Sequence, residues 1–190
     1  MSSTAHARLT TQRVVLVGLM SALVLIFSGF RIMVPIPVDN AAIHLGNIMC
    51  VLSGLLLGPL GGLAAGIGSA LYDLTNPVYA PEAWITFLTK SVIGLLTGLL
   101  SHWHGRKSLS LWWNLAGAAL GSLAYVALYF LKSWLMGKFV FSLAAGSPMV
   151  IFLTTKCVTS AINAVIAVAV SVPLWELIRK PLQRAGVMRE

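Results

Sequence analysis

The chain has 190 residues, of which 58% are hydrophobic and only 9% are charged. A soluble domain would carry about 25% charged residues, so the composition excludes a soluble enzyme or binding domain and indicates an integral membrane protein. The net charge of +8 would suggest a nucleic-acid partner in a soluble protein, but here it first indicates basic cytoplasmic loops. At roughly 20 to 25 residues per span, the length allows five to seven helices and leaves no room for a separate soluble domain.

We expect one all-α membrane domain over residues 1–190, with six transmembrane helices. The predicted spans cover residues 14–33, 43–58, 60–75, 84–100, 111–131 and 148–178. The start of the chain is polar and basic and has no clear cleavage site, so we expect it to be retained before the first span. Residues 34–40 and 76–83 contain prolines and cannot be helical throughout, and we expect the first of these loops to act as a lid.

Residues 43–76 are predicted to form a hairpin of two short apolar helices, with the turn at Gly58 and Pro59. Each helix has about 16 residues, or roughly 24 Å, which is less than the roughly 30 Å of a hydrocarbon core. Glycines at four-residue spacing (54/58 and 62/66) allow the helix backbones to approach closely in lipid. The polar side chains lie at the outer ends, so we expect a depression there lined by His44, Asn47 and Asp73.

The 13 Lys and Arg residues are distributed unevenly between the two sides of the predicted membrane domain. Six spans place both termini on one side, which carries Arg8, Arg13, Arg106, Lys107, Arg179, Lys180, Arg184 and Arg189. The other five fall on the opposite side or within spans: Arg31, Lys90, Lys132, Lys138 and Lys156. Because cytoplasmic loops carry the excess of basic residues, both termini are predicted to be cytoplasmic.

Ionisable and polar residues within the spans are the candidate binding residues. Lys90 lies inside the fourth span, where a charge is costly and usually functional, although it could instead reach the interface or form a structural bridge with Asp73. The last span carries a polar stripe at i, i+3, i+4 and i+7, which serves either substrate contact or hydrogen bonding between helices. The stripe consists of Lys156, Thr159, Ser160 and Asn163.

Each aromatic residue near the outer side also has two possible roles. Tyr125 and Tyr129 follow two glycines at four-residue spacing, and they form either a cavity wall or an interfacial aromatic belt. Trp84 opens the fourth span and serves either as a membrane anchor or as a surface for ligand stacking. On the first span, Gly18 and Ala22 make a small-residue pair that either docks a partner helix or packs within the chain.

The sequence lacks several motifs that would indicate catalysis. It contains no HExxH, no GxSxG-type nucleophile elbow and no phosphate-binding GxxxxGK[ST], so we expect no catalytic residues, no metal site and no cofactor. The two cysteines have no disulfide or metal-ligand spacing. Two alternatives remain: an intramembrane enzyme built around His44, Ser69 and Asp73, and a secondary carrier that uses Lys90 and Asp73 as a gate.

Three stretches resemble the substrate-binding S components of energy-coupling factor (ECF) vitamin transporters: IHLGN (43–47), GLLLGPLGGLAAGIGSALYDL (54–74) and YAPEAWITFLTK (79–90). GLMSA in the first span is similar to the AxxxA coupling motif of that family, with Gly18 in place of the first alanine. The resemblance implies a six-helix, non-enzymatic protein of the bacterial plasma membrane that binds a water-soluble vitamin or precursor from outside. It also implies partners, namely a transmembrane coupling subunit and two ATPase subunits.

Within the family, the hairpin and the LTK sequence look most like the branch for hydroxymethylpyrimidine or pyridoxine-like vitamers. Such a ligand would be held by polar groups and stacked on an aromatic ring, and the expected substrate-binding residues are His44, Asn47, Asp73, Trp84, Lys90, Tyr125 and Asn163. The resemblance also implies that Gly18 and Ala22 bind the partner subunit. S components for cobalamin or riboflavin remain alternatives.

Overall fold

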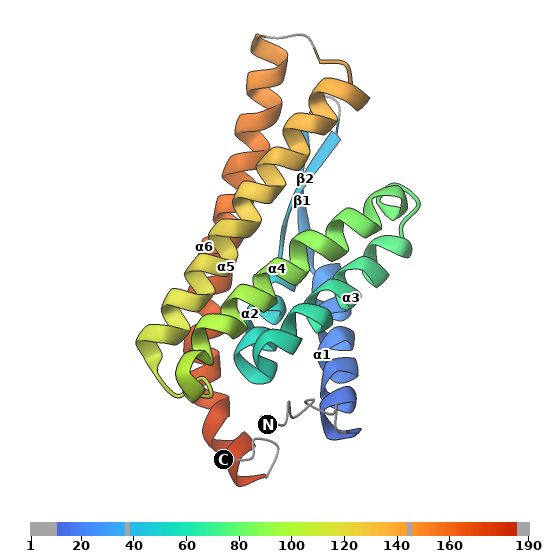
Figure 1. The fold of residues 1–190 in the computed structure, drawn as a ribbon. Coiled ribbons are helices and arrows are strands. Elements are labelled where there is room, and N and C mark those ends of the chain that lie inside the picture. The colour runs from blue at the N-terminus through green and yellow to red at the C-terminus, as the bar shows by residue number, and fades with distance from the viewer. Residues whose placement is uncertain (1–10, 37–38, 144–145, 186–190) are drawn as a thin grey trace, which may run out of the picture.

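The computed structural model describes residues 11–36, 39–143 and 146–185, which form a helical bundle with one β-hairpin (Figure 1). In chain order the elements are α1 (Thr11–Gly29), β1 (Arg31–Ile36), β2 (Asp39–His44), α2 (Gly46–Leu57), α3 (Gly61–Leu74), α4 (Ala83–Ser101), α5 (Leu111–Leu135) and α6 (Ser147–Arg184). Short 3-10 turns occupy Gly58–Leu60, Ala80–Glu82 and Trp103–Gly105, and a π turn, Met136–Val140, continues α5.

In the described part of the chain, five segments are long and apolar enough to cross a membrane. They are Thr11–Gly29, Gly46–Leu74, Ala80–Ser101, Leu111–Val140 and Ser147–Arg184. The predicted class, an all-α polytopic membrane protein, is therefore confirmed. Since α2 has 12 residues and α3 has 14, the pair qualifies only when taken together, and the count of six spans stays a prediction.

The α2–α3 hairpin is present where the sequence indicates it, with its turn at Gly58–Leu60. The Sγ atom of Cys50 on α2 lies 3.8 Å from the Oγ atom of Ser69 on α3, so the two short helices run side by side in opposite directions. Nearly all of α2 is buried, because α1, α3, α4 and α6 surround it. The helix α2 therefore forms the centre of the bundle, while α3 exposes Leu63, Leu71 and Leu74 on its outer side.

Three helices differ in extent from the predicted spans, whose own boundaries stay predictions. The first helix ends at Gly29 instead of residue 33, because the chain then enters a β-hairpin in which Arg31 pairs with His44 and Ile36 with Asp39. An edge strand tolerates Pro35, which has no N–H to donate, so the proline does not mark an irregular loop. The helices α5 and α6 extend beyond the fifth and sixth predicted spans, since α5 continues to Leu135 and α6 continues to Arg184 with Pro173 and Pro181 inside it.

Glycines let the backbones of α2, α3 and α4 approach closely, as the sequence predicts. A Cβ atom placed on Gly98 would lie 2.1 Å from the carbonyl oxygen of Gly58, and one on Gly94 would lie 2.5 Å from that of Gly61. A Cβ on Gly54 would meet the carbonyl oxygen of Gly94 at 2.5 Å. The obstacles are backbone atoms, which no rotamer change can move, so these positions exclude every larger residue.

We expect Gly98→Leu to destabilise the fold by more than about 3 kcal/mol, because overpacking against backbone cannot be relieved by side-chain rearrangement. Gly18 is the matched control, since nothing lies within 4 Å of a Cβ placed there. Size-exclusion profiles and thermal unfolding midpoints in detergent would report both variants. A Gly98→Leu protein that unfolds at the same temperature as Gly18→Leu would contradict the close helix contact.

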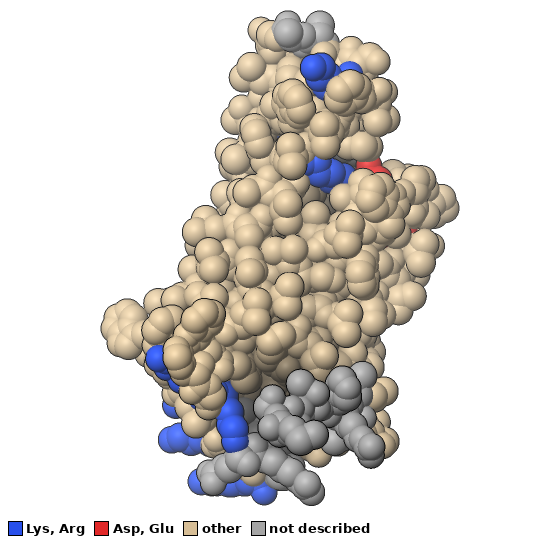
Figure 2. All heavy atoms as spheres, in the orientation of Figure 1, with Lys and Arg blue, Asp and Glu red and all other residues tan. Residues whose placement is uncertain are grey.

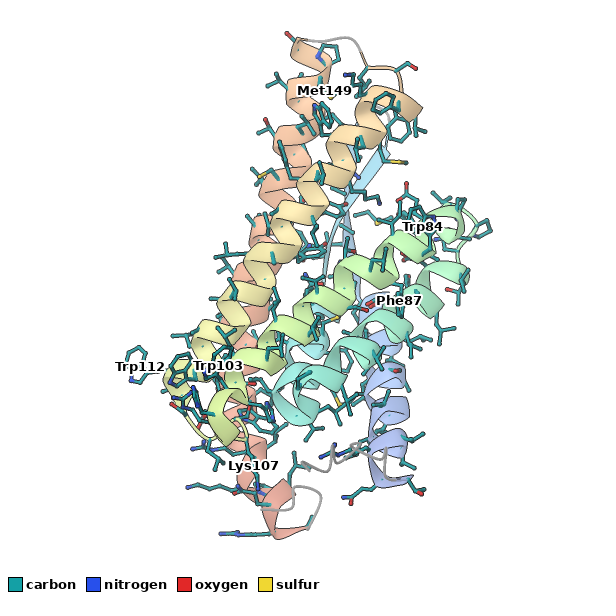
Figure 3. All side chains as sticks on the ribbon, in the orientation of Figure 1. Trp84, Phe87, Trp103, Lys107, Trp112 and Met149 are labelled. Carbon is teal, nitrogen blue, oxygen red and sulfur yellow. The ribbon has the colours of Figure 1, made fainter. Side chains whose placement is uncertain are left out.

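The two ends of the bundle differ in charge. Lys and Arg atoms gather at the end where α1 begins and α6 ends (Figures 1 and 2). Lys107 lies there together with Trp103 and the 76% exposed Trp112, while Trp84 lies toward the opposite end (Figure 3). We call the end of the bundle that carries Lys107, Trp103 and Trp112 the basic end. Exposed tryptophans beside basic residues are typical of a membrane–water interface.

Candidate binding site

A cavity of about 710 Å³ lies in the half of the bundle away from the basic end. Residues from α1, both strands, α3, α4, α5 and α6 line it, so chain segments far apart in sequence build one wall. The volume is within the range of roughly 300 to 1,000 Å³ that is usual for small-molecule sites. The polar groups on its wall determine which ligands the cavity can bind.

Six of the seven predicted substrate-binding residues line this cavity: His44, Asp73, Trp84, Lys90, Tyr125 and Asn163. The seventh, Asn47, lies below the wall on α2 and is 1% exposed. Its Oδ1 atom accepts a hydrogen bond from the Nζ atom of Lys90. Asn47 therefore contacts the cavity only through Lys90.

Lys90 is a buried cation with neutral partners. It is 6% exposed, and besides Asn47 its Nζ atom lies 3.4 Å from Nε2 of His44 and 4.2 Å from the ring centroid of Tyr125. No ion pair joins it to Asp73 in the described residues, so the bridge between the two is absent. Burial of an ammonium costs several kcal/mol unless it is well paired. An acceptor group in the cavity would lower that cost.

His44 ends β2 beside this ammonium. Burial lowers the pKa of His44 well below its usual value, and the positive charges of Lys90 and Arg31 lower it further. The imidazole is therefore neutral at pH 7, and an Nδ1–H tautomer lets Nε2 accept a hydrogen bond from Lys90. Its role in this arrangement is to solvate the ammonium.

Asn163 uses both ends of its amide on the β-hairpin. Its Oδ1 accepts a hydrogen bond from the backbone N–H of His44 at 2.9 Å, and its Nδ2 donates to the carbonyl of Ala42 at 2.7 Å. The hydroxyls of Thr159 and Ser160 bond to carbonyls of their own helix. For this polar stripe, the geometry favours hydrogen bonding within the protein, with Asn163 as the clamp that holds β2 against α6.

The remaining predicted binding residues differ in how deeply they are buried in the protein. Tyr125 is 3% exposed and its ring lies 5.6 Å from that of Tyr129, so it belongs to the inner wall and not to an interfacial belt. Trp84 is 65% exposed and lies at the rim. Asp73 lies in the last turn of α3 and lines the cavity.

The geometry of the cavity gives little support to an intramembrane enzyme built around His44, Ser69 and Asp73. Ser69 contacts Cys50, and in the described chain no hydrogen bond joins Ser69 to His44, which would have to activate it as a nucleophile. The described residues also contain no group of three His, Cys, Asp or Glu side chains that could hold a metal ion.

The model of the family described as "ECF-type riboflavin transporter, S component" matches residues 8–180. The chain belongs to this family. It is thus a transporter S component, a class of membrane protein that is not an enzyme class. An uncharacterised protein of Pyrococcus woesei, described as lying in a gap 3′ region, is 34% identical over 97 residues. That match covers 50% of this chain and 62% of the relative, so the chain spans less than two thirds of that protein.

Sequence reasoning missed two features of this S component. The guanidinium of Arg31 stacks on the rings of Tyr72 and Tyr79, and Lys132 on α5 forms an ion pair with Glu82 in the turn before α4. Arg31, Tyr79, Glu82 and Lys132 all line the cavity. The signal for Arg31 was available, since it is the first charge after a long apolar helix, but without the fold its partners 41 and 48 residues away could not be paired with it.

Gly18 and Ala22 lie on an exposed face of α1 in the S component. The face continues in Val15, Leu19 and Ile26, which are 62%, 55% and 53% exposed. Packing of the Gly18/Ala22 pair within the chain, the alternative to partner docking, is therefore wrong for the described residues.

We expect the stability of the purified S component to fall as the pH drops below about 6.5, because unfolded His44 binds a proton there while native His44 stays neutral. The slope is at most about 1.4 kcal/mol per pH unit for one histidine. Burial also lowers the pKa of His102, which adds a contribution of the same sign.

Thermal unfolding midpoints between about pH 7.5 and 5.5 would separate the two contributions. His44→Gln should flatten the profile, His102→Gln should flatten it less because its ring is less deeply buried, and the double variant should be flattest. If His44→Gln retains the wild-type pH dependence, neutral His44 in the native state is ruled out.

Proposed function

We propose that this S component is the substrate-binding subunit of an ATP-driven ECF importer and that the 710 Å³ cavity captures a water-soluble vitamin or precursor. The observation that carries the proposal is Lys90, a buried cation with neutral protein partners at the wall of a small-molecule cavity. Buried charges inside membrane proteins are costly and usually mark substrate sites. A ligand acceptor would complete the environment of this ammonium.

The proposed orientation follows from the charge distribution. Arg106 and Lys107 lie in the loop after α4, and Arg179, Lys180 and Arg184 lie at the end of α6. The positive-inside rule assigns this basic end to the cytoplasm, so six spans would place both termini there. The cavity then faces outward in a bacterial plasma membrane, as uptake requires.

The ligand we propose is a vitamin with a heteroaromatic ring, stacked on Tyr125 and reaching Trp84 at the rim. Riboflavin is favoured by the cavity volume, which suits a fused ring with a side chain, and by the description of the matching family. Hydroxymethylpyrimidine or a B6 vitamer is favoured by the resemblance of the hairpin and of residues 88–90. Cobalamin, with its corrin ring and nucleotide loop, is a third candidate from the same class of transporters.

Identification of the co-purified small molecule tests this proposal. The S component would be purified in detergent from cells grown in rich medium, denatured, and the released compounds analysed by mass spectrometry. We expect one unmodified heteroaromatic vitamin at a substantial fraction of the protein. A chemically converted product would instead favour the intramembrane enzyme.

A further inference from the structure

Arg31 is held in one position by contacts from three parts of the chain. Its guanidinium carbon lies 4.2 Å from the ring centroid of Tyr72 on α3 and 5.1 Å from that of Tyr79 in the loop before α4. Its Nε atom donates a hydrogen bond to the carbonyl of Ser28, in the last turn of α1, at 3.2 Å. Stacking on two rings with one N–H fixed leaves the planar group little rotational freedom.

The two terminal nitrogens of Arg31 have no hydrogen-bond or ion-pair partner in the described residues, and Arg31 lines the cavity. Of the two carboxylates on the same wall, Glu82 pairs with Lys132, and Asp73 forms no ion pair with Arg31 in the described part of the chain. The donor fork of Arg31 is thus preorganised at the wall of the cavity, and no acceptor among the described residues forms a hydrogen bond or ion pair with its terminal nitrogens. A rigid donor pair binds a matching acceptor pair with little loss of conformational entropy.

We infer that Arg31 selects ligands that present two adjacent acceptor atoms in one plane. This inference rests on the proposed function of the cavity as a vitamin site. The guanidinium fork donates two parallel N–H bonds, a geometry that fits a carboxylate or a ring carbonyl beside an unprotonated ring nitrogen. Riboflavin has the second kind of edge and nicotinate has the first. Hydroxymethylpyrimidine has neither, because its amino group places a donor beside the ring nitrogen.

Pairs of ligands that differ in one acceptor test the inference. Riboflavin would be compared with 1-deazariboflavin and 5-deazariboflavin, in which a C–H replaces one ring nitrogen, and nicotinate with nicotinamide, in which an NH₂ replaces one oxygen. Hydroxymethylpyrimidine is the ligand without an acceptor pair. Affinities would be measured by titration calorimetry on the detergent-purified wild-type chain, Arg31→Lys and Arg106→Lys. Arg106 is the matched control because it stacks on Trp113 at 4.3 Å in the basic end.

We expect the wild type to bind either riboflavin or nicotinate about tenfold or more tightly than one of its one-acceptor analogues, the range of a bidentate contact. For riboflavin, Arg31→Lys should remove that preference, because an ammonium is a point donor. For nicotinate, whose negative charge an ammonium still attracts, Arg31→Gln should remove it, while Arg106→Lys should retain either preference. Tyr79→Leu, which removes one stacking ring, should reduce the preference without abolishing it. If riboflavin shows the preference, the edge of a ring supplies the two acceptors. If nicotinate shows it, a carboxylate supplies them.

Three results would overturn the inference. They are no preference in the wild type, a preference that survives in Arg31→Lys for riboflavin or in Arg31→Gln for nicotinate, and binding of hydroxymethylpyrimidine alone. Each would leave the S component as a vitamin-binding subunit. Failure of the wild type to bind any of these ligands, together with the absence of a co-purified vitamin, would overturn the proposed function as well. Thermal unfolding of Arg31→Lys would verify that the variant is folded, and Arg31→Gln gives a second variant with the same expectation.

Discussion

Replacement of Lys90 by methionine is expected to lower the affinity for the vitamin by about 10- to 150-fold, which corresponds to the roughly 1.5 to 3 kcal/mol of a hydrogen bond from a charged donor. Methionine retains the length and the apolar stem of lysine but cannot donate. Asn47 and His44 would lose their contact with the ammonium, yet the buried charge would disappear at the same time. Because removal of a buried charge is often neutral or stabilising, we expect the unfolding temperature of the ligand-free variant to stay near that of the wild type.

The combination of lost affinity and retained stability distinguishes a ligand contact from a structural role. Titration calorimetry with the co-purified vitamin would measure the affinity, and thermal unfolding in detergent would measure the stability. Lys107→Met in the basic end is the matched control, since it removes the same charge far from the cavity. If Lys90→Met binds the vitamin with wild-type affinity, then Lys90 serves only to connect α4 with α2 and the β-hairpin.

The helices were predictable because apolar length and glycine spacing are local properties of the sequence. The β-hairpin was not, since its register depends on the pairing of Arg31 with His44 across a segment whose prolines resemble a loop. The helix α6 extends past its apolar stretch to Arg184 although Pro181 lies inside it, so neither hydropathy nor helix propensity indicates its end. Burial predicts where a helix must be apolar, but it does not predict where the helix ends.

The sequence predicts which residues form the candidate site, but it does not predict which of them contact one another. Lys90 stands out as an ionisable residue within a span, whereas its acceptor Asn47 is 43 residues away and was expected to contact ligand itself. Asn163 lines the cavity as expected, but its amide also forms two hydrogen bonds with the backbone of β2, which the sequence does not indicate. The sequence predicts that such residues lie at the same depth in the membrane. Only the fold determines whether they contact a ligand or one another.

The exposed face of α1 that contains Gly18 and Ala22 is the surface we propose for the coupling subunit. Small side chains there would let a partner helix approach closely, and a bulky one would separate the backbones and remove the dispersion contacts that hold helices together in lipid. We therefore expect Ala22→Trp to abolish complex formation and ATP-dependent uptake. Vitamin binding by the isolated variant should be unchanged, because Ala22 is not among the residues that line the cavity.

Uptake of labelled vitamin into proteoliposomes would measure this separation of binding from transport. Vesicles would contain this chain alone or together with the coupling subunit and both ATPases, and Leu123→Trp would serve as the control, since Leu123 is a 64% exposed residue on α5. The control should transport normally if only the α1 face docks the partner. Concentrative uptake by the chain alone, driven by an ion gradient, would instead establish the secondary carrier, in which Lys90 and Asp73 act as a gate and Ala22→Trp has no effect.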